Sequence, residues 1–136
     1  RFDRPYRCRL GDGLTCIQAG EVDGAVICGM GGPLMVKILQ NSYEVWQSLH
    51  FAVLQPQSEA GILRRYLYQH GWHIEDERLV IDDGRFYEMM RAVPGQADAL
   101  PDWLYDIGPV NWQRRDPLLG RKIDILMETK GHILEA

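Results

Sequence analysis

Three short segments of this sequence carry residue types that could contact a ligand. They are Gly11-Asp12-Gly13-Leu14, Gly29-Met30-Gly31-Gly32 and Gln55-Pro56-Gln57. Each follows a strand-like apolar run and precedes a stretch whose apolar residues recur at helical spacing. In a parallel α/β sheet, such positions lie beyond the carboxyl ends of the strands, where ligands bind. The spacing therefore predicts one ligand site built from these three segments.

The first two segments suit different parts of a ligand. The carboxylate of Asp12 can accept a hydrogen bond from an exocyclic amine such as that of adenine, although a plain turn or a helix cap is the alternative. Three glycines before Pro33 offer backbone N–H groups at a helix N-terminus, where a phosphate could bind, and Met30 could line a pocket for a flat group. A conformationally demanding turn is the alternative there, because neither a P-loop nor a dinucleotide fingerprint is present.

The third segment offers amides instead of charges. The side chains of Gln55 and Gln57 can read the edge of a base through paired donor and acceptor groups, and the alternative is a strand stop at Pro56 followed by a helix cap at Ser58. The sequence has no GxSxG or HExxH motif and no cysteine pair with metal-ligand spacing. We therefore expect neither a hydrolytic site nor a metal site.

The elements that would position these segments alternate along the chain. Apolar runs predict strands at residues 6–10, 22–28 and 51–54. Apolar residues at helical spacing predict one helix from Pro33, with a break near Asn41-Ser42, and a second helix that ends near Gly71. The run 25–28 lacks alternation, which is typical of a strand buried on both faces. Two further β-rich runs, 78–81 and 86–93, flank Asp82–Arg85 and predict a hairpin. The order predicts an α/β fold with an antiparallel edge.

Composition is that of one ordinary globular domain. The chain has 136 residues, a formal charge of −4 and 46% hydrophobic residues, and it contains no apolar run near the roughly 20 residues that span a bilayer. Cys8 and Cys28 stand in strand-like runs, so we expect buried, structural thiols and a reducing, cytoplasmic setting.

The region from Trp103 onward predicts a helical tail in which Leu119, Ile123, Leu126 and Ile133 share one face. Its basic residues are the candidate RNA contacts, namely Arg114, Arg115, Arg121 and Lys122. Acidic residues offset them, so a solvated helix face is the competing interpretation.

As an ordered set, several motifs resemble the bacterial tRNA (adenine-22) N1-methyltransferase family. They are RLGDGL at 9–14, GMGG at 29–32, LQPQ at 54–57, LRRYLYQHGW at 63–72, FYE at 86–88 and IGP at 107–109. The resemblance implies a Rossmann-like class I methyltransferase sheet of strand order 3-2-1-4-5-7-6 with a helical C-terminal extension. It also implies S-adenosyl-L-methionine as cofactor and tRNA as substrate.

Carried over by position, the resemblance assigns roles to the three segments. Asp12, Gly13 and Leu14 would form the adenine-contacting turn of the cofactor site, and Gly29, Met30, Gly31 and Gly32 would border the methionine end of the cofactor and the target base. Gln55, Pro56 and Gln57 stand near the incoming adenine, with Gln57 at a position where the family usually has Asn. The implied division is residues 1–95 for the Rossmann-like part and 102–136 for the helical extension.

The resemblance also implies that this chain begins just before the third strand of the family fold. The glycine-containing cofactor loop and the acidic residue that holds the ribose would precede it, and the sequence opens on Arg1 instead of Met. We therefore expect a truncated product with half a cofactor site and no methyl transfer by itself. The alternatives are a class I methyltransferase for another substrate and a non-catalytic α/β binding module.

Overall fold

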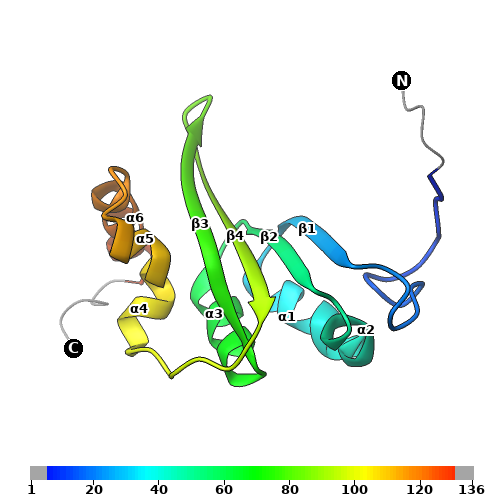
Figure 1. The fold of residues 1–136 in the computed structure, drawn as a ribbon. Helices are drawn as coiled ribbons and strands as arrows, with labels where there is room; N and C mark the ends of the chain where they lie inside the picture. Colours follow the sequence, from blue (N-terminus) through cyan, green and yellow to red (C-terminus); the bar gives the residue numbers. More distant parts are fainter. Residues whose placement is uncertain (1–5, 131–136) are drawn as a thin grey trace.

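The structure, a computed structural model, describes residues 6–130. Four strands and six helices follow one another along this part of the chain (Figure 1). They are β1 (Gly24–Met30), α1 (Gly32–Asn41), α2 (Tyr43–Gln47), β2 (Phe51–Pro56), α3 (Ala60–Gln69), β3 (Trp72–Asp82), β4 (Arg85–Pro94), α4 (Asp102–Ile107), α5 (Pro109–Arg114) and α6 (Leu119–Lys130).

The strands form one mixed sheet of order β1-β2-β4-β3. β1 pairs with β2 in parallel, whereas β4 is antiparallel to both β2 and β3. This order reproduces the last four positions, 4-5-7-6, of the strand order that the resemblance implies. The predicted α/β fold with a partial Rossmann-like sheet and an antiparallel hairpin is therefore confirmed, and the tail from residue 102 to 130 is helical as expected.

The core lies between one face of the sheet and the helices α1, α2 and α3. The strands contribute Ile27, Leu54 and Met90 to this core, and the helices contribute buried side chains that include Met35, Leu39, Trp46, Leu63 and Leu67. The break predicted near Asn41-Ser42 is confirmed, because α1 ends at Asn41 and α2 begins at Tyr43. It lets Trp46 turn inward, where it is fully buried against Trp72 and Tyr66.

None of the described helices covers the other face of the sheet, so the run 25–28 is not buried on both faces as predicted. Val26 is 68% exposed while its neighbour Ile27 is 8% exposed. The helices cover only the face that carries Ile27, so the pleat leaves Val26 and Cys28 on the uncovered side. Cys8 and Cys28 are both exposed, and the expectation of buried thiols is wrong.

The strand predicted at residues 6–10 is also wrong, since this segment has no regular structure. A strand needs a neighbour to pair with, and every described strand pairs only within β1-β2-β4-β3. Side-chain contacts hold the segment instead: Arg9 donates to the carbonyl of Cys16 at 3.0 Å and forms an ion pair with Glu21. Residues 12–17 form turns, closed by hydrogen bonds from Thr15 N to Asp12 O and from Ile17 N to Leu14 O.

Helices α4, α5 and α6 lie together beside β3 and contact the sheet and its helices (Figure 1). α4 packs on α3, and α5 packs on β3. On α6, Leu126 is buried and Ile123 is half-buried, as the shared face predicts, whereas Ile133 lies outside the described residues.

Candidate functional site

The carboxyl ends of β1 and β2 bring two of the three predicted segments into direct contact. The backbone N–H of Gly29 donates to Gln55 Oε1 at 3.0 Å, and the N–H of Gln57 donates to the carbonyl of Met30 at 2.9 Å. Gly29 has φ of +80°, where the register between β1 and β2 shifts. This left-handed conformation favours glycine and turns the GMGG loop across the end of β2.

A close approach between the GMGG loop and the start of α3 explains why the last residue of this motif, Gly32, is a glycine. The N–H of Gly32 donates to the carbonyl of Ser58 at 2.8 Å, and a Cβ at Gly32 would stand 2.2 Å from the carbonyl oxygen of Glu59. Only glycine leaves room for that contact. The same approach overturns Ser58 as the predicted N-cap, because the N-cap residue is Glu59 with φ of 50° and no capping side-chain hydrogen bond.

The third segment, Asp12-Gly13-Leu14, lies elsewhere along α1. A Cβ at Gly13 would stand 2.8 Å from Ile38 Cγ2, and Leu14 packs against the core. Ile38 is six residues beyond Gly32, which is about 9 Å along a helix at a rise of 1.5 Å per residue. The structure therefore brings the second and third segments together. The first segment lies apart from them, farther along α1, and Asp12 is exposed.

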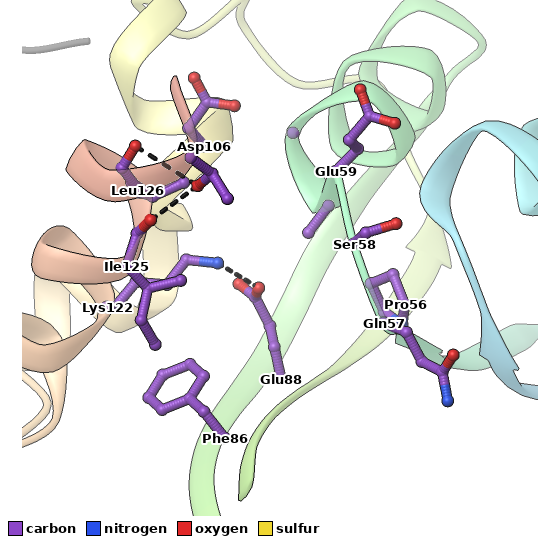
Figure 2. Close-up of a pocket in the computed structure, with 13 residues that line it drawn as sticks. Pro56, Gln57, Ser58, Glu59, Phe86, Glu88, Asp106, Lys122, Ile125 and Leu126 are labelled. Atoms are coloured by element: carbon purple, nitrogen blue, oxygen red, sulfur yellow. Dashed lines mark hydrogen bonds and ion pairs between the residues drawn. The ribbon is translucent and has the colours of Figure 1, made fainter. Parts of the chain in front are cut away.

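A pocket of about 420 Å³ adjoins the end of β2. Figure 2 shows it between α6 on one side and the start of α3 on the other, with Phe86 and Glu88 of β4 at its base. Gln57 and Ser58 belong to its lining, so it borders the same strand end as the GMGG loop. The remaining lining residues are Pro56, Glu59, Ala60, Gly61, Asp106, Lys122, Ile125, Leu126 and Thr129.

A buried ion network underlies this pocket and ties the helical tail to the sheet. Arg64 of α3 is fully buried, and its Nε donates to Glu77 Oε1 at 2.7 Å while Nη2 pairs with Glu88. Lys122 of α6 pairs with the other oxygen of Glu88. Arg64 Nη1 also donates to the carbonyl of Tyr105 at 2.7 Å. Burial alone would raise the pKa of Glu88, but the charges of Arg64 and Lys122 outweigh it, so the pKa is lowered.

Glu77 extends the network to α5. Its Oε2 accepts hydrogen bonds from the backbone N–H groups of Val110 at 2.9 Å and Asn111 at 3.0 Å. A shift in register between Ile74 and Asp76 turns Glu77 to the core side of β3. Charges removed from water are costly unless they are paired and hydrogen-bonded, and this network satisfies both conditions.

The predicted RNA-contacting residues separate into two groups. Arg114 and Arg115 at the end of α5 and Arg121 on α6 are exposed, and Arg114 also pairs with Asp116 at 2.8 Å. Lys122 is only 7% exposed, so the competing interpretation of a solvated helix face is wrong for this residue. The amphipathic spacing of α6 turns it toward the pocket, where Glu88 binds its ammonium group.

Several site residues were missed by the sequence argument, although the sequence carries a signal for two of them. Glu88 stands on the core side of a strand beside Met90 and Ala92, and Arg64 follows Leu63 on the apolar face of a helix. A charge on an otherwise apolar face predicts a buried ion pair. Phe86 and Asp106 had no such signal, because their role in the pocket depends on how the tail helices dock.

The sheet order and the glycine loop after β1 define a Rossmann-like α/β domain whose functional edge is the carboxyl end of its parallel strands. Comparison with known families agrees, and it is more specific: the Methyltransferase domain matches residues 1–90. The chain belongs to this family.

Individual relatives have longer chains. A curated relative, the tRNA (adenine(22)-N(1))-methyltransferase of Bacillus subtilis, is 37% identical over 94 residues, which are 69% of this chain and 40% of that protein. The solved structure of Streptococcus pneumoniae Sp1610 in complex with S-adenosyl-L-methionine has a TM-score of 0.82 and 29% identity, covering 93% of this chain and 59% of that one. The B. subtilis m1A22 tRNA methyltransferase TrmK has a TM-score of 0.77 and 30% identity, covering 90% and 55%. This chain thus spans about half the length of these relatives.

Proposed function

We propose that the protein transfers a methyl group from S-adenosyl-L-methionine to N1 of an adenine in tRNA. The observation that carries the proposal is the junction of the GMGG loop with Gln55-Pro56-Gln57, in a chain that belongs to the Methyltransferase domain family. The relative from B. subtilis, named as a tRNA (adenine(22)-N(1))-methyltransferase, supports the choice of tRNA and of adenine N1.

The residues at this junction fit one end of the cofactor. The loop Gly29–Gly32 has little side-chain bulk, and the amide nitrogen of Gln57 lies 3.9 Å from where a Cβ at Gly29 would stand. When bound, S-adenosyl-L-methionine supplies an electrophilic methyl group whose bond to sulfur breaks, both electrons staying on sulfur, as the N1 lone pair forms the new bond. Asp12, Gly13 and Leu14 would hold the adenine end of the cofactor along α1.

The chain's contribution to the reaction is positioning. Neutral adenine N1 already has a lone pair, so no residue needs to remove a proton, and alignment supplies most of the acceleration. The amide of Gln57 can orient a base edge beside the GMGG loop. Because N1 lies on the Watson–Crick edge, the target base must be unpaired or flipped out of its stack.

The helical tail is the proposed RNA-contacting region. We propose residues 1–95 as the methyltransferase part and 102–136 as the extension, with Arg114, Arg115 and Arg121 contacting phosphates. Lys122 has a separate role, since its charge is committed to Glu88. The described residues contain no helix long and apolar enough to cross a membrane. Because tRNA is the proposed substrate, we propose a cytoplasmic setting.

Calorimetric titration of S-adenosyl-L-methionine into the protein made from its complete reading frame tests the cofactor assignment. We expect Asp12→Ala to weaken binding about tenfold or more, because a hydrogen bond between a charged group and the adenine amine is lost. Asp23→Ala is the matched control, since the Asp23 side chain is 87% exposed at the start of β1. Equal affinity of all three proteins would overturn the assignment of Asp12, and absence of binding to the unmodified protein would overturn the proposed function.

A further inference from the structure

The pocket between α6 and α3 lies beside the junction of the GMGG loop with Gln55-Pro56-Gln57, and the three predicted segments contribute only Pro56 and Gln57 to it. It adjoins the GMGG loop, because a Cβ at Gly31 would stand 2.9 Å from the hydroxyl of Ser58, a lining residue. Its volume of about 420 Å³ lies within the roughly 300–1,000 Å³ of small-molecule sites. A planar base with its ribose is of that size class.

We propose that this pocket receives the target adenine base of the RNA, with Phe86 as its stacking surface and α6 as the wall that closes it. The proposal rests on the proposed function and deepens it by assigning the substrate subsite. Phe86 is half-buried on β4 and stands at the base of the pocket in Figure 2. Every base has a π-face that can stack on such a ring.

The charges of the pocket favour a base and disfavour a phosphate. The described residues that line it include the carboxylates of Glu59, Glu88 and Asp106 and a single basic side chain, that of Lys122. Lys122 and Glu88 are paired with each other, and Glu88 also pairs with Arg64, so neither Lys122 nor Glu88 is available to an incoming group. The carboxylates of Glu59 and Asp106 carry the negative charge that an incoming group meets. Carboxylates accept hydrogen bonds from an amino group such as N6 of adenine, and they repel both phosphate oxygens and the O6 carbonyl of a 6-oxopurine.

Helix α6 supplies a complete wall of the pocket. Lys122, Ile125, Leu126 and Thr129 recur at three- and four-residue spacing, so they lie on one face of the helix. Figure 2 shows this face opposite the start of α3, with Lys122 joined to Glu88 across the base of the pocket. The helical tail therefore takes part in base recognition, in addition to contacting the RNA backbone.

Saturation-transfer NMR with millimolar adenosine tests the proposal on the protein made from its complete reading frame. Excess S-adenosyl-L-homocysteine is added to occupy the donor site, so that the remaining signal reports a second adenosine site. We expect adenosine to bind, Phe86→Ala to weaken binding by about tenfold, and inosine, which has an oxo group in place of the amine, to bind at least about tenfold more weakly. Tyr87→Ala is the matched control, because Tyr87 is the next aromatic residue on β4 and points to the opposite face of the sheet.

A second variant guards against misfolding at Phe86. Thr129 is exposed on α6, so Thr129→Trp leaves the core intact and fills the pocket from its rim. We expect it to abolish the adenosine signal while circular dichroism stays unchanged. The proposal is overturned if adenosine does not bind, if both variants bind it like the unmodified chain, or if inosine binds equally well.

The two proposals fail separately. Methyl transfer to tRNA that persists undiminished in Phe86→Ala and Thr129→Trp would reject the pocket alone. Adenosine binding that depends on Phe86, in a protein that transfers no methyl group, would reject the reaction and leave a nucleoside site.

Discussion

Replacing Arg64 by methionine is the sharpest test of how the tail is held on the sheet. The guanidinium is fully buried, and it binds Glu77, Glu88 and the carbonyl of Tyr105. Methionine keeps a long apolar side chain but removes the charge and every one of these hydrogen bonds. Two carboxylates then remain in the interior, and of these Glu88 still pairs with Lys122.

The expected cost follows from the burial of these charges. Removing one partner of a buried ion pair costs about 3–5 kcal/mol, because an uncompensated charge is left behind. A domain of this size has a total free energy of unfolding of about 5–15 kcal/mol. Arg64→Met should therefore remove about a fifth or more of the stability. It should loosen α4 first, since Arg64 donates directly to its backbone.

The next residue along the helix is the matched control. Arg65 is half-buried, with its side chain 42% exposed; it pairs with Asp102 at 3.0 Å and lies over the ring of Tyr105 at 4.5 Å. Exposed pairs contribute about 0–1 kcal/mol, so Arg65→Met should cost about 1 kcal/mol or less. Urea unfolding followed by tryptophan fluorescence measures both. Equal losses for the two variants would refute the buried network as the main tie between tail and sheet.

Three further predictions follow from the same structure. Because Arg64 and Lys122 lower the pKa of Glu88 in the folded state, its contribution to stability is present above the ordinary glutamate pKa of about 4.3 and is lost as pH falls below it. Urea unfolding from pH 7 to pH 3 should thus show a shallower loss of stability for Glu88→Gln than for the unmodified chain, and equal slopes would contradict the assignment. Gly32→Ala should cost about 1–3 kcal/mol in urea unfolding, because its Cβ would meet the Glu59 carbonyl oxygen at 2.2 Å. Gly120→Ala, whose Cβ would meet no atom within 4 Å, should instead stabilise α6 by up to about 1 kcal/mol. A larger loss for Gly120→Ala than for Gly32→Ala would be incompatible with the described loop. Cys28 is exposed on the open face of β1, so a thiol reagent should label it in native buffer far faster than the chain unfolds, and labelling at the unfolding rate would show a covered face.

Local patterns were enough to predict most of the sheet and its helices. The apolar spacing after Pro33, the break at Asn41-Ser42 and the Asp-Gly turn between β3 and β4 all express preferences of a few neighbouring residues. β3 begins at Trp72, six residues before the predicted run. The sequence pattern did not show its first half, because Glu77 and the register shift at Ile74–Asp76 interrupt the alternation of apolar residues.

The errors share one physical cause. The run 25–28 is apolar whether or not a helix covers its second face, and residues 6–10 read as a strand whether or not a neighbour is there to pair with. Arg121 and Lys122 are neighbouring basic residues that the sequence does not distinguish, yet in the fold Lys122 pairs with Glu88. Such contacts between distant segments also make the pocket at Phe86, so no local pattern could have located it.

Methyl transfer itself is the most direct test of the central claim. The protein from its complete reading frame is incubated with isotope-labelled S-adenosyl-L-methionine and unmodified tRNA, and the digested nucleosides are separated and identified by mass spectrometry. We predict label in 1-methyladenosine, reduced at least about tenfold by Gln57→Ala, because the amide that orients the base edge is removed. Label in another nucleoside, or no label in tRNA, would contradict the account.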